Sequence, residues 1–222
     1  MSSSVFWVLV RKDMYILRIF SITGLLTGLA ALGAMFIGKA GFVIGGILYL
    51  TANVAMGIMI AMYGYLTDRR EHTRVFSLSL PISGQQHELA KLTAVFLTYG
   101  IPWTILTIIA VFLLPMSGAI PRGLLVFALL VQGCCLALFS LLVALLFVAT
   151  TELLGGLAVI ATNILFSLFM VIVSQSAVSD PLKGPHIVWT GPALGLLSAE
   201  MGLIVVALVF AISTIFRKQD YL

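Results

Sequence analysis

Charged residues are scarce in this sequence: they make up 9% of the 222 residues, whereas 61% are hydrophobic. Soluble domains contain about a quarter charged residues, so this composition excludes a soluble globular protein. Cysteine is also rare, and the two cysteines, Cys134 and Cys135, are adjacent. Because a disulfide needs a Cα separation and torsion that neighbouring residues seldom reach, we expect two small apolar packing residues and no disulfide.

The patterns of common catalytic and metal sites are missing or incomplete. Residues 33–40 resemble a phosphate-binding P-loop, but Ala40 stands where a Ser or Thr should reach Mg²⁺. Residues 87–91 lack the second histidine of a zinc-protease motif, and His72 and His186 are isolated. The sequence has no Gly-x-Ser-x-Gly motif and no clustered pair of carboxylates in an apolar run. We therefore expect no enzyme activity of its own, no metal site and no bound cofactor.

Long apolar runs dominate what is present. A helix that crosses a bilayer needs about 20 mainly apolar residues, and backbone groups in lipid must be satisfied within the segment. Runs of this length without alternating polarity exclude a membrane β-barrel. The sequence therefore predicts an all-α polytopic membrane protein whose six spans cover residues 14–37, 41–66, 92–114, 123–149, 153–178 and 194–216.

Basic residues gather on one side of the predicted spans. Only Lys39, Arg122 and Lys183 fall on the other side. Short cytoplasmic loops carry an excess of Lys and Arg, so we expect both termini and residues 67–91 in the cytoplasm and the protein in a plasma membrane, of a bacterium. The net charge of +4 is then a topology signal, and we expect no nucleic-acid partner. The nine cytoplasmic cations are Arg11, Lys12, Arg18, Arg69, Arg70, Arg74, Lys91, Arg217 and Lys218.

The segments outside the spans have their own patterns. Residues 1–13 are apolar with a basic end, which is typical of a short interfacial helix with Trp7 at headgroup level. They contain no early positive charge and no small-residue cleavage site, so we do not expect a cleavable signal peptide. Residues 179–193 hold several Pro and Gly residues, which excludes one continuous helix in this predicted outer loop.

The loop over residues 67–91 is the longest polar segment of the chain. Pro81 should stop a helix that arrives from the second span, and Ser83 with Gln86 has the spacing of a capping box. We expect a short amphipathic helix on the cytoplasmic face before the third span. A plain connector whose cations set topology and contact anionic lipid is the alternative. The residues expected to face water are Gln85, Gln86, Glu88 and Lys91.

With these residues in view, the chain resembles the permease subunits of ABC-2-type exporters. That family has a charged cluster after its second span, then a Thr, a Leu-rich stretch, Leu-Pro-Ile/Val-Ser/Thr and a Lys at the head of span three. Six spans and an outer loop before the last span also fit. His72 departs from the family, which usually has Gly there. The matching residues are Asp68, Arg70, Glu71, Thr73, Leu78, Leu80, Pro81, Ile82, Ser83 and Lys91.

The resemblance implies a coupling helix that docks on a separate cytoplasmic ATPase subunit, which would hold the ATP and Mg²⁺. Two permease protomers, identical or different, and two ATPase subunits would form an exporter for hydrophobic or amphiphilic cargo such as lipid-like molecules, peptides or drugs. Glu152, in the second cytoplasmic turn, is a minor contact. The implied main contacts are Arg70, Glu71, Arg74, Pro81, Ser83, Gln85, Gln86 and Glu88.

Few polar residues lie within the predicted spans. Glu200 either belongs to a substrate path or gate, or reaches the membrane interface at the outer end of its span. Asn53, Gln132 and Asn163 are expected to form hydrogen bonds between helices, with substrate contact as the alternative.

Small residues recur at the spacing that lets helices approach closely. The pairs are Gly24 with Gly28 and Gly41 with Gly45, and they could pack within one protomer or between two. Two other functions stay open: a membrane-embedded enzyme that modifies lipid, and a non-catalytic assembly or sensor protein.

Overall fold

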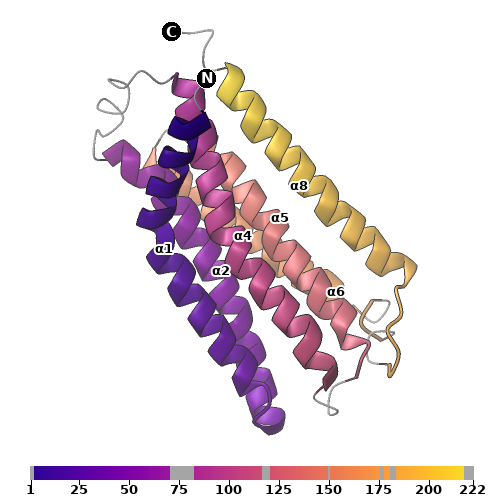
Figure 1. Ribbon diagram of the computed structural model, residues 1–222. Coiled ribbons are helices and arrows are strands. Elements are labelled where there is room, and N and C mark those ends of the chain that lie inside the picture. Colours follow the sequence, from indigo (N-terminus) through magenta and orange to yellow (C-terminus); the bar gives the residue numbers. More distant parts are fainter. Residues whose placement is uncertain are drawn as a thin grey trace.

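In the part of the chain that the structure describes, six long helices form one bundle (Figure 1). Each of the six is long and apolar enough to cross a membrane, and the described residues contain no strand, which confirms the predicted fold class. The computed structural model describes residues 3–70, 83–116, 121–149, 151–175, 178–180 and 184–217. The helices are α1 (Ser3–Ala34), α2 (Gly38–Arg70), α4 (Gly84–Met116), α5 (Leu124–Val148), α6 (Glu152–Ser174) and α8 (Gly191–Arg217).

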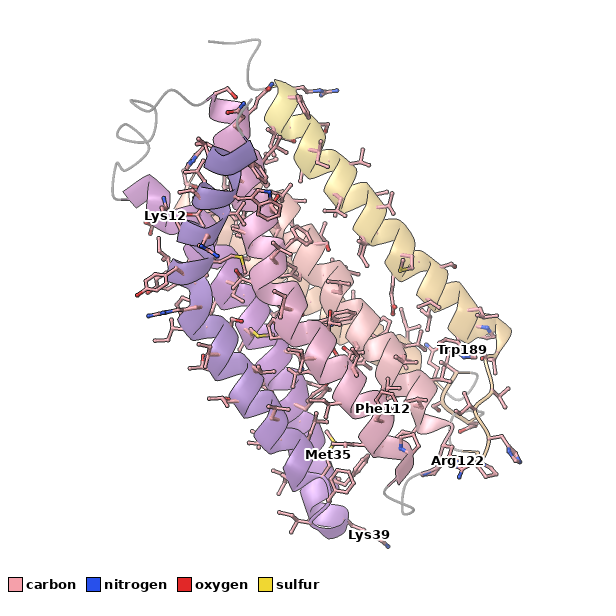
Figure 2. The ribbon with its side chains drawn as sticks, in the orientation of Figure 1. Lys12, Met35, Lys39, Phe112, Arg122 and Trp189 are labelled. Carbon is pink, nitrogen blue, oxygen red and sulfur yellow. The ribbon has the colours of Figure 1, made fainter. Side chains whose placement is uncertain are left out.

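Helix α1 begins and helix α8 ends at the same end of the bundle (Figure 1). We call this the terminal end, and the other the opposite end. Figure 2 shows Lys12 toward the terminal end and Lys39 and Arg122 at the opposite end. These three residues thus lie at the ends that the charge pattern predicts, and the cytoplasmic placement of the terminal end stays a prediction.

Helix α1 includes the residues expected to form a separate interfacial helix. It runs from Ser3 to Ala34 without a break at residue 13. The first residues contain no Pro or Gly, and Leu9 and Val10 are buried against Ala90 and Ala94 of α4. One face of this segment therefore packs on α4, while Trp7 is 57% exposed and its contact with the membrane surface stays a prediction.

Helix α4 likewise joins two predicted elements. The expected amphipathic segment after Ser83 and the third span form one helix of 33 residues. At about 1.5 Å per residue this helix is roughly 50 Å long, so it exceeds the hydrocarbon thickness of about 30 Å by several turns. Pro102 lies inside the helix without ending it.

The turns at the opposite end follow local sequence rules. Gly38 opens α2 with a φ of 82°, a conformation that glycine adopts without steric cost. Residues 184–190 are not helical, and Thr190 precedes α8, where its Oγ1 accepts a hydrogen bond from the Ala193 N–H at 3.4 Å. Pro192 lies in the first turn of α8, where its missing N–H costs nothing.

Helix α5 lies at the centre of the bundle, with 67% of its most apolar window buried. It contacts α2, α4, α6 and α8. Its Phe139 stacks on Tyr99 of α4 with ring centroids 4.0 Å apart, and its Phe147 packs on Tyr65 of α2 at 4.7 Å. Only 17% of the corresponding windows of α6 and α8 is buried, so these two helices form much of the apolar outer surface.

Candidate functional site

The first turns of α4 carry the described part of the predicted contact surface. The Gln86 N–H donates to Ser83 Oγ at 3.3 Å, and the His87 N–H donates to the Ser83 carbonyl at 3.2 Å. The helix therefore begins where the capping pattern places it. Gln85 and Glu88 are half-buried on the same two turns.

Lys91 corrects an expectation. It was predicted to face water, but it is 6% exposed, and its Nζ lies 5.6 Å from the centroid of the Tyr65 ring. An ammonium over an aromatic face at this distance is attracted by the ring. The N-terminal half of α1 covers this side of α4, and the sequence gives no sign that it would.

The covering half of α1 also contributes an acid that the sequence analysis passed over. Asp13 is 9% exposed, and its Oδ1 lies 3.3 Å from the half-exposed Lys12 Nζ. Leu9, Asp13 and Leu17 are four residues apart and all buried. An acidic residue between apolar residues at helical spacing is a signal in the sequence that could have identified Asp13. Asp13 of α1 and Lys91 of α4 are therefore both buried toward the terminal end.

Glu152 lies at the start of α6, also at the terminal end. It is exposed in the first helical turn, where a negative charge is favourable beside the free amide groups. Thr151 caps this helix, because its Oγ1 accepts a hydrogen bond from the Leu154 N–H at 3.3 Å.

The remaining predicted contact residues fall at the edge of the described chain or beyond it. Arg70 is the last residue of α2, and its side chain is not described. Glu71, Arg74 and Pro81 lie outside the described residues. The structure thus brings Ser83, Gln85, Gln86 and Glu88 together on one helix start and places Glu152 on another helix at the same end.

The asparagines within the spans were predicted to form hydrogen bonds between helices, but each bonds within its own helix. Asn53 is fully buried, and its Nδ2 donates to the Tyr49 carbonyl of its own helix at 2.9 Å. Asn163 is exposed and donates to the Val159 carbonyl, also within its own helix, at 2.8 Å. Both residues border a cavity of about 30 Å³ between α2, α4, α5 and α6.

The Gln132 side chain was expected to form a hydrogen bond to another helix, but it forms none among the described residues. Its backbone carbonyl accepts from Trp103 Nε1 of α4 at 3.1 Å, which joins α4 to α5. The side-chain amide takes no part in this bond. Its Nε2 and Oε1 are buried without a hydrogen-bond partner among the described residues.

Glu200 lies inside the bundle and not at the membrane interface. It is 6% exposed, and it is nine residues into α8, about 14 Å from the helix start. Its two carboxyl oxygens are buried and have no hydrogen-bond partner within the described part of the chain. A Cβ on Gly133 of α5 would lie 3.2 Å from the Glu200 Cδ, so the carboxyl packs directly on that glycine.

The P-loop-like residues 33–40 and the partial zinc-protease motif at residues 87–91 both lack the structural context that such motifs need. Residues 33–40 form the turn between α1 and α2, so no strand precedes them as in a P-loop. Within the described ranges no group of three or more His, Cys, Asp or Glu side chains could hold a metal ion. Cys134 and Cys135 are buried and unpaired.

No protein-family model, curated protein sequence or solved structure matches this chain. The family resemblance therefore rests on residues 68–91 and on the six-helix architecture. The candidate site consists of the terminal end of α4 and the part of α1 that packs on it.

Proposed function

We propose that this chain is the membrane-spanning subunit of an ATP-binding cassette exporter of the ABC-2 type. A separate cytoplasmic subunit binds and hydrolyses ATP with Mg²⁺, and a second permease protomer completes the transporter in a bacterial plasma membrane. The cargo is hydrophobic or amphiphilic. Support comes from the six apolar helices and from the charged segment with its Leu-Pro-Ile-Ser pattern after the second span.

The continuity of α4 is the observation that carries the proposal. Its first turns hold the half-buried polar residues Gln85, Gln86 and Glu88, and the same helix then continues to Met116. A force applied to these turns by a soluble subunit passes along one hydrogen-bonded element through the whole bilayer. A flexible joint at residue 91 would have absorbed such a force.

The contacts of α4 indicate which helices move with it. Leu9 and Val10 of α1 pack on its first turns, and Lys91 lies against Tyr65 of α2. Helices α1, α2 and α4 therefore form one half of the protomer. Helix α5 packs extensively on α8 and on α6, and these three form the other half.

Transport then requires one half to shift against the other. Asn53 and Asn163 border the small cavity between the halves, which has room for about one water molecule. Glu200 lies at the contact of α8 with α5. In the proposed cycle this cavity widens and Asn53 and Asn163 line the path, whereas Glu200 stays packed between α8 and α5 within the second half.

The test begins with purification of the tagged full chain in mild detergent, followed by identification of the proteins that accompany it. We expect an ATPase with a P-loop. Replacing both Gln85 and Glu88 by Ala should reduce cargo-stimulated ATP hydrolysis at least about fivefold, because loss of two interface contacts weakens docking by about 1 kcal/mol or more. Membrane insertion should not change.

Lys39→Ala is the matched control, because Lys39 is exposed at the opposite end of the bundle. It should leave co-purification and ATP hydrolysis as they are. Unchanged coupling in the Gln85/Glu88 double variant would contradict the proposal. Phosphatase activity of the purified chain without any partner would favour a lipid-modifying enzyme instead.

A further inference from the structure

A second cavity, of about 300 Å³, lies between α1, α2, α4 and α5 toward the opposite end of the bundle. Its described lining residues include no charged side chain. Val43 and Ile47 of α2 border it and are 59% and 61% exposed, so the cavity opens on the surface that faces the membrane. Its walls are formed mainly by Met35, Leu50, Ala110, Leu114 and Phe127. Its size is at the lower limit of ligand pockets.

Two polar side chains interrupt these apolar walls. Gln132 is 2% exposed and Tyr49 is 6% exposed, and both line the cavity. Both polar atoms of the Gln132 amide have no hydrogen-bond partner among the described residues, whereas the Tyr49 hydroxyl interacts with the Asn53 side chain of its own helix. Buried polar atoms are nearly always paired, because leaving them unpaired costs the full loss of hydration. The two unpaired polar atoms of the Gln132 amide on the wall of this cavity therefore point to a ligand that forms hydrogen bonds.

The chemistry of these atoms defines the ligand. An amide and a hydroxyl each offer a donor and an acceptor and carry no charge. A charged headgroup would lose its hydration in this cavity without gaining a counter-charge. An alkyl chain alone would leave the Gln132 amide unpaired. A small neutral amphiphile with an amide or hydroxyl group meets both conditions.

We propose that this cavity binds a neutral amphiphile from the bilayer, whose apolar part fills the space and whose hydrogen-bonding group contacts Gln132 and Tyr49. Only the identification of this ligand as transported cargo rests on the proposed function. Binding itself requires no ATPase.

Gly46 offers a way to fill the cavity without disturbing the bundle. It lines the cavity, and a Cβ added there would meet only the Met35 Cε, at 4.0 Å. Gly46→Leu therefore places a side chain into the space. Gly202→Leu on α8 is the matched control, because Gly202 is exposed and no other atom lies within 4 Å of its added Cβ.

The experiment measures binding of tritiated nonanamide to the full chain in phosphatidylcholine nanodiscs, after subtraction of partitioning into empty discs. We expect saturable binding that unlabelled nonanamide displaces and that nonane and nonylammonium displace at least about tenfold less well. Gln132→Met, which removes only the polar atoms, should weaken binding about tenfold. Tyr49→Phe tests the hydroxyl separately and does not depend on how the first variant folds.

Gly46→Leu should abolish saturable binding, and Gly202→Leu should leave it within about twofold, as for surface changes away from a site. Equal displacement by nonane and nonanamide would overturn the inference, since the polar atoms would then be irrelevant. Binding that survives Gly46→Leu would also overturn it. Saturable binding to a chain that recruits no ATPase would uphold this site and reject the proposed function. ATPase coupling without nonanamide binding would do the reverse.

Discussion

Single glycines determine how closely α1 and α2 approach. An added Cβ at Gly41 would lie 2.5 Å from the Ala34 carbonyl oxygen, and one at Gly45 would lie 2.6 Å from that of Ala31. Helices in lipid associate through close packing, because no hydrophobic force draws them together. The glycine pairs singled out in the sequence therefore pack within one protomer, where Gly24 also faces Met56.

Gly45→Ala should destabilise the protein by about 1–3 kcal/mol, because the nearest obstructing atom is the backbone carbonyl oxygen of Ala31, which cannot rotate away. Gly46→Ala is the control in the next position, where an added Cβ has room. It should be neutral or slightly stabilising. Thermal unfolding of both purified variants checks this, and equal melting temperatures would show that α1 can yield.

Contacts between residues on different helices could not be predicted from the sequence. Glu200 could be placed in the last span, but the glycine beneath it, Gly133, belongs to another helix and is far away in the sequence. Lys91 was placed in water because its neighbours Gln85 and Glu88 are polar. Its burial depends on contacts with other helices, such as that with Tyr65 of α2, which no local pattern reveals.

At the scale of elements, hydropathy predicted all six helices but not all their ends. The bounds of α5 and α6 agree closely with the expected spans at the ends where a short polar turn joins them, residues 149–152. Helices α1 and α4 begin about ten residues before the first and third predicted spans, because each includes a segment that was expected to form a separate helix. Hydropathy marks where a chain enters hydrocarbon, whereas a helix continues into water until a cap or a breaker stops it.

Trp103 provides the described hydrogen bond that joins α4 to α5. Trp103→Phe should lower the free energy of unfolding by about 1 kcal/mol, in line with other hydrogen bonds between membrane helices. Trp189→Phe is the control, since Trp189 is 37% exposed before α8 (Figure 2). A chemical unfolding curve in detergent measures both. An equal loss in the two variants would mean that ring size matters and the hydrogen bond does not.

For the whole molecule, the main prediction concerns orientation. Lys12 and Lys39 lie toward opposite ends of the bundle (Figure 2), and both are accessible. A membrane-impermeant maleimide added to intact cells should label Lys39→Cys but not Lys12→Cys, and should label both after permeabilisation. The parent chain serves as background because Cys134 and Cys135 are buried.

The reverse labelling pattern would place residues 67–91 outside the cell. No cytoplasmic ATPase could then reach the start of α4, and the proposed function would fail with the topology. The labelling therefore tests both the orientation of the protein in the membrane and the access of a cytoplasmic ATPase to α4.

The central position of α5 has a consequence for biosynthesis. Ribosomes deliver α5 to the translocon before α6 and α8 exist, so acyl chains must occupy the flank that α8 later covers. Apart from Gln132 and Ser140 its sequence is apolar, so this interim exposure to lipid costs little. The packing of α5 is complete only when α8 is inserted and displaces those acyl chains. Chains in which that last insertion fails are the ones that membrane proteases should degrade.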